Sequence, residues 1–190
     1  NLFVGISLAF ATPALANDVV ILNGRVIDPE SGLDAVRNVA IDNGEIVAIS
    51  EFPLVGETVI DASGHVVAPG FIDLHAHGQN IGDYRMQAMQ GVTTALELES
   101  GVLPISEWYA GQAEKNLPIN YGAAAGWTFS RIATFTNTDP LSDISYFQDA
   151  QGRDDWKLDI ASEEQSVRII DLVEEGLNEG ALGIGINAGY

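Results

Sequence analysis

Short β-branched runs separated by turn residues fill the first third of the chain. The expected strands are residues 18–28, 36–42, 45–50, 58–61 and 65–68. Asn43-Gly44 lies between two of these runs with the spacing of a two-residue hairpin turn. A second turn signal, Asn23-Gly24, falls inside the first run. This pattern predicts a small β-sandwich or partial barrel over residues 17–68.

From Pro69 onward, strand patterns alternate with helix patterns. Strands are expected at residues 71–75, 92–99, 119–126 and 181–186, and helices at 82–90, 106–116 and 162–179. Ser162 is a typical helix cap before the last of these helices, and Gly180 is a typical end. The polar stretch 136–159 is too long for a simple strand-to-helix loop. The alternation predicts an α/β domain with a parallel sheet over residues 69–190.

The first sixteen residues have the pattern of a secretory signal peptide. An apolar run over residues 2–11 is followed by Ala14-Leu15-Ala16, which suits cleavage after Ala16. The run is too short to span a bilayer, so we expect no stable membrane insertion after cleavage. The chain has neither an initiator Met nor a basic leading segment, which indicates a clipped start. We expect export to the periplasm or the cell exterior; an apolar strand or anchor is the alternative.

Composition narrows the possible partners and ligands. The chain has 190 residues, with 8 Lys and Arg against 27 Asp and Glu, a net charge of −19. This charge argues against nucleic acid, because binding to phosphates requires basic side chains. Hydrophobic residues make up 46% of the chain, which is ample for a buried core. The absence of Cys excludes disulfides and thiolate zinc ligands, so a metal would need His, Asp, Glu or a modified Lys.

Two of the three histidines lie two residues apart at the end of an apolar strand. Side chains alternate along a strand, so Asp73, His75 and His77 are expected to share one face. Two imidazoles at this spacing can converge on one metal ion. Chemistry in parallel barrels is found at this carboxyl end of the strands. His65 lies in the preceding β segment, and we expect it to have a structural role.

The segment APGFIDLHAHG, residues 68–78, resembles the metal-binding strand of the amidohydrolase superfamily. DVVILNGRVIDPESG and the later GVTTALELESG resemble the β-sandwich and second barrel strand of those enzymes. The terminal SEEQSVRIIDLVEEGLNEGALGIGINAGY is similar to the D-aminoacylase branch, the N-acyl-D-amino-acid deacylases. The resemblance implies a partial (β/α)8 TIM-type barrel preceded by a small β-sandwich.

The resemblance also implies a chemistry. It makes His75 and His77 ligands of a divalent metal, most naturally one or two Zn²⁺ ions, since neutral imidazole suits zinc. Such a metal activates water to attack a small-molecule amide, here an N-acyl-D-amino acid. Cyclic amide hydrolysis of the dihydroorotase or hydantoinase type is an alternative, as is a non-catalytic exported binding remnant. Asp73 is expected beside the imidazoles, or else as a cap on backbone amides.

The second barrel strand departs from the family pattern. The D-aminoacylase resemblance places a metal-binding Cys where this chain has Ser100, and a neutral hydroxyl is a poor zinc ligand. Strand alternation puts Glu97 and Glu99 on the inner face. Two acids inside a barrel are costly unless they are paired or bind a metal. Glu99 is the better ligand candidate; Glu97 is alternatively a buried acid paired with Lys or Arg.

Two further positions bear on the site. Trp127 stands where the resemblance expects a His, and it either lines a pocket or packs. Arg131 either binds a substrate carboxylate at the barrel mouth or is a solvent-facing helix residue. Neither Lys115 nor Lys157 fits a bridging carboxylated lysine. Since a whole barrel needs about 250 residues, we expect a truncated barrel, inactive alone, whose remaining ligands and catalytic Asp lie beyond Tyr190.

Overall fold

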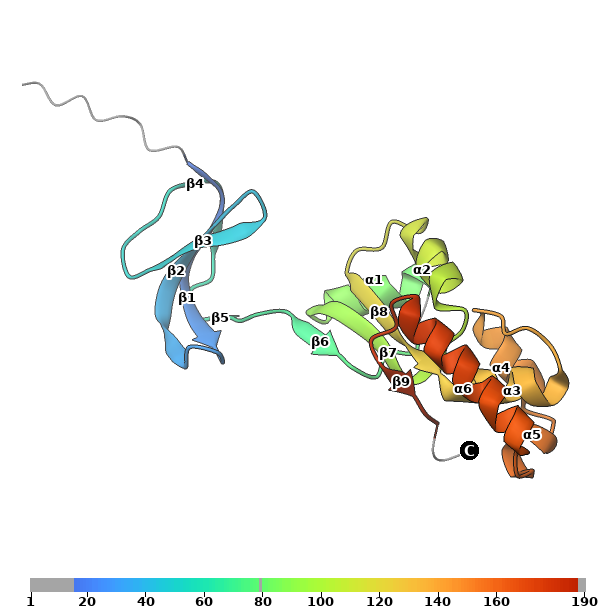
Figure 1. Ribbon diagram of the computed structural model, residues 1–190. Coiled ribbons are helices and arrows are strands. Elements are labelled where there is room, and N and C mark those ends of the chain that lie inside the picture. The colour runs from blue at the N-terminus through green and yellow to red at the C-terminus, as the bar shows by residue number, and fades with distance from the viewer. Residues whose placement is uncertain (1–15, 79, 188–190) are drawn as a thin grey trace, which may run out of the picture. The chain divides into compact units, whose positions relative to one another are not determined.

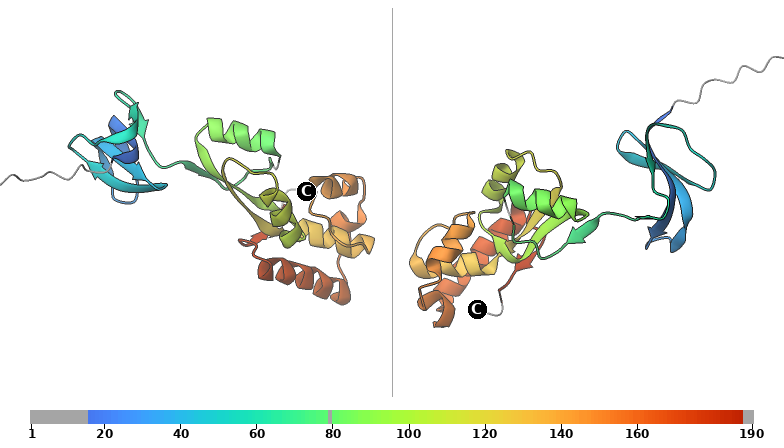
Figure 2. Two further views of the ribbon diagram at one scale, coloured as in Figure 1. Left: turned by 90° about the horizontal axis from the view of Figure 1, so that it is seen from above. Right: turned by 180° about the vertical axis from the view of Figure 1, so that it is seen from behind.

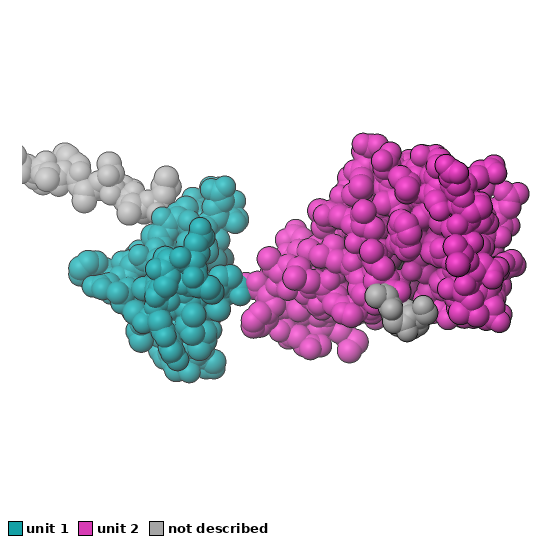
Figure 3. All heavy atoms as spheres, turned by 60° about the horizontal axis from the view of Figure 1, so that its bottom comes forward, with its two compact units in different colours: residues 1–69 teal, residues 70–190 magenta. Residues whose placement is uncertain are grey.

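The computed structural model describes residues 16–78 and 80–187. The chain divides into two compact units, with the boundary between Pro69 and Gly70 (Figure 3). Except for Ala16, the predicted signal peptide lies outside the described residues. Within the described ranges, none of the helices combines the length and apolar character needed to cross a bilayer.

The first unit is built on one mixed sheet. Its strands are β1 (Asn17–Asp28), β2 (Leu33–Asp42), β3 (Glu45–Ser50), β4 (Gly56–Asp61) and β5 (Val66–Val67). The strand order is β3-β2-β1-β4, and β5 also pairs with β1. The β1–β2 and β2–β3 pairs are antiparallel, whereas β4 and β5 run parallel to β1. The first unit is thus a small β domain, as expected, but all of these strands lie in a single sheet, and its described residues do not form the two facing sheets of a sandwich.

The two Asn-Gly pairs have different outcomes. Asn43 and Gly44 have φ angles of 51° and 79° and form the predicted tight hairpin turn. Asn23, with φ 63°, forms a bulge instead, and β1 continues through it. The Asn23 N–H donates to Asn38 Oδ1 at 2.9 Å, a side chain on the neighbouring strand. The strand predicted over residues 18–28 is therefore present, and the Asn23-Gly24 signal marks a bulge in it, where this distant side chain supplies a hydrogen-bond partner.

The second unit contains a parallel sheet. Its strands are β6 (Phe71–Asp73), β7 (Val92–Val102), β8 (Asn120–Gly126) and β9 (Ile184–Gly185). They lie in the order β6-β7-β8-β9, and every neighbouring pair is parallel (Figure 1). Helix α1 (Ile81–Met89) connects β6 to β7, and α2 (Ile105–Ala113) connects β7 to β8. This alternation is the one predicted for a partial barrel.

Four helices lie between β8 and β9, and the two short ones fall in the polar stretch that was too long for a loop. They are α3 (Trp127–Thr136), α4 (Ile144–Ala150) and α5 (Asp155–Leu158), followed by α6 (Glu163–Asn178). Helix α3 begins directly at the end of β8 and contacts α4, α5 and α6 (Figure 2). Ile132, Ala150 and Trp156 form the buried cluster between these helices. Helices α4 and α5 were not predicted because each is short and lies in a mostly polar stretch.

Helix α6 agrees most closely with its prediction. Ser162 accepts from the N–H of Gln165, whose side chain binds back to the Ser162 N–H, forming a capping box. Gly180, at φ +107°, follows the helix end. The strand after it spans only two residues, so the prediction of residues 181–186 was too long. This short strand nevertheless brings the chain back to the sheet edge beside β8.

Candidate metal centre

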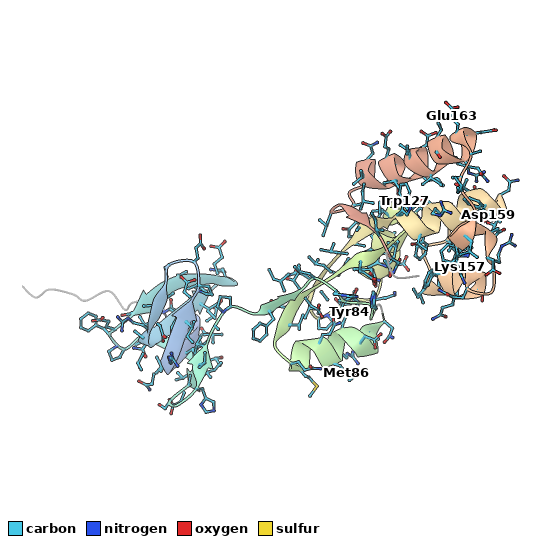
Figure 4. All side chains as sticks on the ribbon, turned by 90° about the horizontal axis from the view of Figure 1, so that it is seen from below. Tyr84, Met86, Trp127, Lys157, Asp159 and Glu163 are labelled. Carbon is cyan, nitrogen blue, oxygen red and sulfur yellow. The ribbon has the colours of Figure 1, made fainter. Side chains whose placement is uncertain are left out.

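The segment after β6 turns His75 and His77 to one side. The N–H of Ala76 donates to the carbonyl of Leu96 at 3.0 Å, which ties the segment to β7. The Ala76 side chain is buried against Tyr84, which points from α1 toward the sheet while Met86 points away (Figure 4). The two imidazoles lie on the opposite side, with their Nε2 atoms 2.8 Å apart. The predicted shared face of His75 and His77 is therefore present.

Glu99 joins the two imidazoles from the neighbouring strand. Its Oε2 lies 3.6 Å from His75 Nε2 and 3.4 Å from His77 Nε2. Two ligand atoms bound to one tetrahedral zinc at about 2.1 Å lie roughly 3.4 Å apart. The two imidazole–carboxylate distances fit a shared ion, whereas the two Nε2 atoms, 2.8 Å apart, would have to separate slightly to bind it. The donor set of two imidazoles and one carboxylate also suits zinc. His75, His77 and Glu99 together form a group that could hold a metal ion.

Glu97 lies behind His77 and is almost fully buried, with 2% of its surface exposed. His77 Nδ1–H donates to Glu97 Oε2 at 2.8 Å, and the Ser100 N–H donates to Oε1 at 3.1 Å. The alternative of a Lys or Arg partner for Glu97 is thus wrong, because a His and a backbone amide satisfy it. The contact keeps the proton on Nδ1 and leaves Nε2 facing Glu99 and His75.

Two residues that the sequence analysis did not select complete the surroundings of Glu99. Asn187 Nδ2 donates to Glu99 Oε2 at 3.1 Å and to Ser100 Oγ at 2.8 Å. Thr128 Oγ1, in the first turn of α3, donates to Asn187 Oδ1 at 3.1 Å. Ser100 Oγ donates in turn to Glu99 Oε2 at 3.2 Å. The only signal in the sequence was that Asn187 is a polar residue just after a barrel strand.

Glycines allow Asn187 to approach Glu99. A Cβ on Gly185 would lie 2.7 Å from the Gly101 nitrogen and 2.9 Å from the Glu99 carbonyl oxygen. A Cβ on Gly101, which has φ +65°, would lie 2.6 Å from the Ala124 carbonyl oxygen. Contacts this short exclude a side chain, so β7, β8 and β9 meet backbone to backbone at this point. The chain two residues beyond Gly185 therefore lies within hydrogen-bonding reach of Glu99.

Asp73 has the second of its two expected roles, a cap on a backbone amide, whereas Arg131 has neither of the roles expected for it. Asp73 Oδ1 accepts the backbone N–H of His75 at 3.0 Å, so it caps the segment instead of binding an imidazole. Arg131 donates to the carbonyls of Trp156 at 2.8 Å and Asp159 at 3.0 Å. Partial burial lowers the pKa of the Arg131 guanidinium. Arg131 thus joins α3 to the α5 segment, and this structural role replaces the predicted contact with a substrate carboxylate.

Trp127 is the first residue of α3, at its junction with β8 (Figure 4). Its side chain is half-buried and packs on the core that contains Phe129 and Val173. Of the two roles left open for it, the structure shows packing. Lys115 binds Gln112 Oε1, and Lys157 lies in α5. Neither observation places a lysine among the candidate metal ligands, as a bridging role would require.

A cavity opens beside His77. It has a volume of about 360 Å³ and is lined by α1 and α2 residues, among them Asp83, Trp108 and Gln112. Tyr84 of α1 is buried, and burial, followed by the proximity of Tyr121 and Glu97, raises the pKa of its phenol to about 12. The phenol is therefore neutral at ordinary pH. The side chains of His75 and His77 are 64% and 49% exposed, so a small molecule has access to both.

Known proteins resemble this chain in sequence and in fold. A dihydroorotase from Streptococcus pneumoniae is 34% identical over 132 residues, which cover 68% of this chain and 25% of that protein. An N-acyl-D-glutamate deacylase from Bordetella bronchiseptica, solved with zinc and a phosphonate inhibitor, superposes with a TM-score of 0.68 at 22% identity. A D-aminoacylase described as having a binuclear metal centre gives 0.71 at 22% identity. Both superpositions cover 92% of this chain.

The chain spans 39% of each of those two solved structures. At their level of identity, the likeness establishes the fold alone, a mixed α/β unit whose parallel sheet forms part of a barrel, preceded by a small β domain. A family model adds evidence at the level of sequence, since it matches residues 58–187, including the histidine pair and the strand that contains Glu99. This match covers more than half of the chain, and the chain therefore belongs to the amidohydrolase family.

Proposed function

We propose that the full-length protein is a metal-dependent hydrolase that removes the acyl group from N-acyl-D-amino acids. The observation that carries this proposal is the convergence of His75, His77 and Glu99 at the carboxyl ends of two neighbouring parallel strands. The superposition on a D-aminoacylase and an N-acyl-D-glutamate deacylase supports the substrate class. Family membership supports hydrolysis of carbon–nitrogen bonds other than peptide bonds.

At this centre, three residues would bind the metal and a fourth would orient one of the ligands. His75 and His77 offer Nε2 atoms, and Glu99 offers the negative charge that two neutral imidazoles lack. Glu97 orients His77 through its Nδ1–H. A bound divalent ion, which we propose to be Zn²⁺, would lower the pKa of a water molecule and polarise the amide carbonyl. The cavity beside His77 offers room for the amide substrate.

The test uses the full-length protein, loaded with zinc after chelation. We expect release of the D-amino acid from N-acetyl-D-amino acids, and much slower release from the L-isomers. His75→Ala should lower both zinc content and hydrolysis, whereas His65→Ala should change neither. His65 is a matched control, since its Nδ1 lies 3.1 Å from the Ser63 carbonyl in the other unit. Zinc content that is unchanged in His75→Ala would refute the proposal.

A second candidate function is hydrolysis of a cyclic amide. Its support is the 34% identity to a dihydroorotase, which exceeds the identity to the deacylase structures. The same zinc-loaded preparation distinguishes the two when it is assayed with dihydroorotate and with N-acetyl-D-amino acids. Ring opening without deacylation would favour the second candidate. Zinc binding without either reaction would favour a non-catalytic binding protein.

A further inference from the structure

A polar chain of contacts crosses three elements next to the candidate metal centre. It runs from Thr128 at the start of α3, through the Asn187 amide, to Ser100 and Glu99 on β7. Thr128 is 4% exposed and Ser100 is 6% exposed. Buried polar groups that are fully hydrogen-bonded to one another fix a single arrangement of their side chains.

We infer that Thr128 and Asn187 are positioning residues that fix the Glu99 carboxylate for metal binding. This inference rests on the proposed metal site. Glu99 Oε2 is the oxygen that faces both imidazoles, and it accepts one hydrogen bond from Asn187 and one from Ser100. These two donors restrict rotation of the carboxylate before a metal binds. Less side-chain entropy is then lost when the metal binds.

Thr128 determines which end of the Asn187 amide faces Glu99. An amide can present either its oxygen or its NH₂ group, and the hydrogen-bond partners select between them. The Thr128 hydroxyl donates to Oδ1, so Nδ2 is left to face Glu99 Oε2 and Ser100 Oγ. Without this hydroxyl, Oδ1 would lose its donor, and only the contacts of Nδ2 with Glu99 and Ser100 would hold the amide in place.

The experiment measures zinc affinity of the full-length protein by competition with a chromophoric chelator. Thr128→Val keeps the side-chain shape and removes the hydroxyl, and we expect zinc affinity to fall about 10-fold, as is typical for residues behind a ligand. Thr128→Ser restores the hydroxyl and should recover affinity. Thr134→Val is the matched control, since Thr134 is also buried on α3 but donates to the Ser130 carbonyl within the helix.

Asn187→Ala provides a second variant, because Asn187 is only partly buried and its replacement leaves the helix core intact. We expect it to reproduce the loss in Thr128→Val and to alter the visible spectrum of the Co²⁺-substituted protein. Equal zinc affinity in wild type, Thr128→Val and Asn187→Ala would overturn the inference. If instead the wild type binds no zinc, or His75→Ala binds as well as the wild type, the proposed metal site itself fails.

Discussion

Glu99 and Ser100 are adjacent and both contact Asn187. They differ in charge, and therefore in their value as ligands for a metal ion. Glu99 carries a negative charge, and its Oε2 faces both imidazole Nε2 atoms. Ser100 is a buried neutral hydroxyl that donates to this same oxygen. At the proposed metal site, two neutral imidazoles would not compensate the charge of a dication. The anionic ligand would then be Glu99, with Ser100 as a donor to its carboxylate.

This difference predicts a ranking of two variants. Glu99→Gln keeps the shape but removes the charge, so it should weaken zinc binding strongly and abolish most turnover. Ser100→Ala removes one of two donors to Oε2 and should have a smaller effect. Zinc titration and hydrolysis rates of the two full-length variants test the ranking. A greater loss in Ser100→Ala would show that the ligand assignment is wrong.

Glu97 leads to a second prediction, because it uses both carboxylate oxygens as acceptors. Oε2 accepts from His77 and Oε1 from the Ser100 amide. In Glu97→Gln, one of these donors would face an NH₂ group instead of an acceptor. We expect a loss of about 1–3 kcal/mol in the free energy of unfolding, measured by urea denaturation. Glu114→Gln, at an exposed position after α2, should be neutral; an equal loss there would contradict this account.

The sequence reveals some of these residues and hides others for a physical reason. Strand alternation is local, so it correctly placed His75 and His77 on one side of their segment and Glu97 and Glu99 on the side of β7 that faces them. Asn187 reaches Glu99 because Gly185 approaches the backbone of β7 at Glu99 and Gly101, more than 80 residues earlier in the chain. Arg131 was placed wrongly for a similar reason: its partners are carbonyls of a later segment, 25 and 28 residues further on.

Among the elements, the ends of α2 and α6 are joined by one side chain. Glu179, just after α6, accepts from the Ser106 N–H at 3.0 Å and from Ser106 Oγ at 2.7 Å. A carboxylate in this position satisfies free amides in the first turn of α2 and favours the helix dipole. Partial burial acts to raise the pKa of Glu179, but the hydrogen bonds from Ser106 and Ile105 outweigh it and lower the pKa below its usual value.

The lowered pKa of Glu179 determines how its contribution to the free energy of unfolding depends on pH. A carboxyl group with a lowered pKa in the folded state stabilises the fold above its unfolded pKa, and this contribution is lost as pH falls through the folded pKa. Glu179→Gln should therefore cost about 1 kcal/mol at pH 7, and the difference from wild type should shrink toward pH 3. Glu174→Gln, exposed on α6, is the control. A difference that does not change with pH would refute the charge-based explanation.

Helices and turns were predicted correctly where neighbouring residues in the sequence determine them. They were missed where contacts between distant segments determine them. The capping box of α6 and the Asn43-Gly44 hairpin are set by neighbouring residues, and both were correctly located. Helices α4 and α5 are short and pack on α3, so residues 136–159 appeared only as a polar stretch. The bulge at Asn23 likewise depends on Asn38, from a neighbouring strand.

For the whole molecule, we propose export with cleavage after Ala16. The apolar run and the Ala14-Leu15-Ala16 site support this proposal. Expression with the native leader in a bacterial host should yield a secreted or periplasmic protein that begins at Asn17, as read by N-terminal sequencing. Ala14→Glu together with Ala16→Glu should block cleavage, because the site requires small residues. An uncut cytoplasmic product from the native leader would refute the proposal.

Metal binding should also be visible in the stability of the whole molecule. A ligand that binds only the folded state stabilises it by RT ln(1 + [L]/Kd), about 2.7 kcal/mol at a free zinc concentration 100 times the Kd. The centre joins the segment after β6 to β7, so it exists only when these strands are paired. Chelation should therefore lower the Tm of the full-length protein, and added zinc should restore it.

Two histidine variants separate this effect from zinc bound elsewhere on a chain of net charge −19. Tm of His75→Ala should respond little to zinc or chelator, because one of its three ligand groups is gone. His65→Ala retains the centre and should respond as the wild type does. The measurement is a thermal scan of each protein across a zinc titration at fixed ionic strength. Equal zinc responses in His75→Ala and wild type would show that the stabilising ion lies at another site.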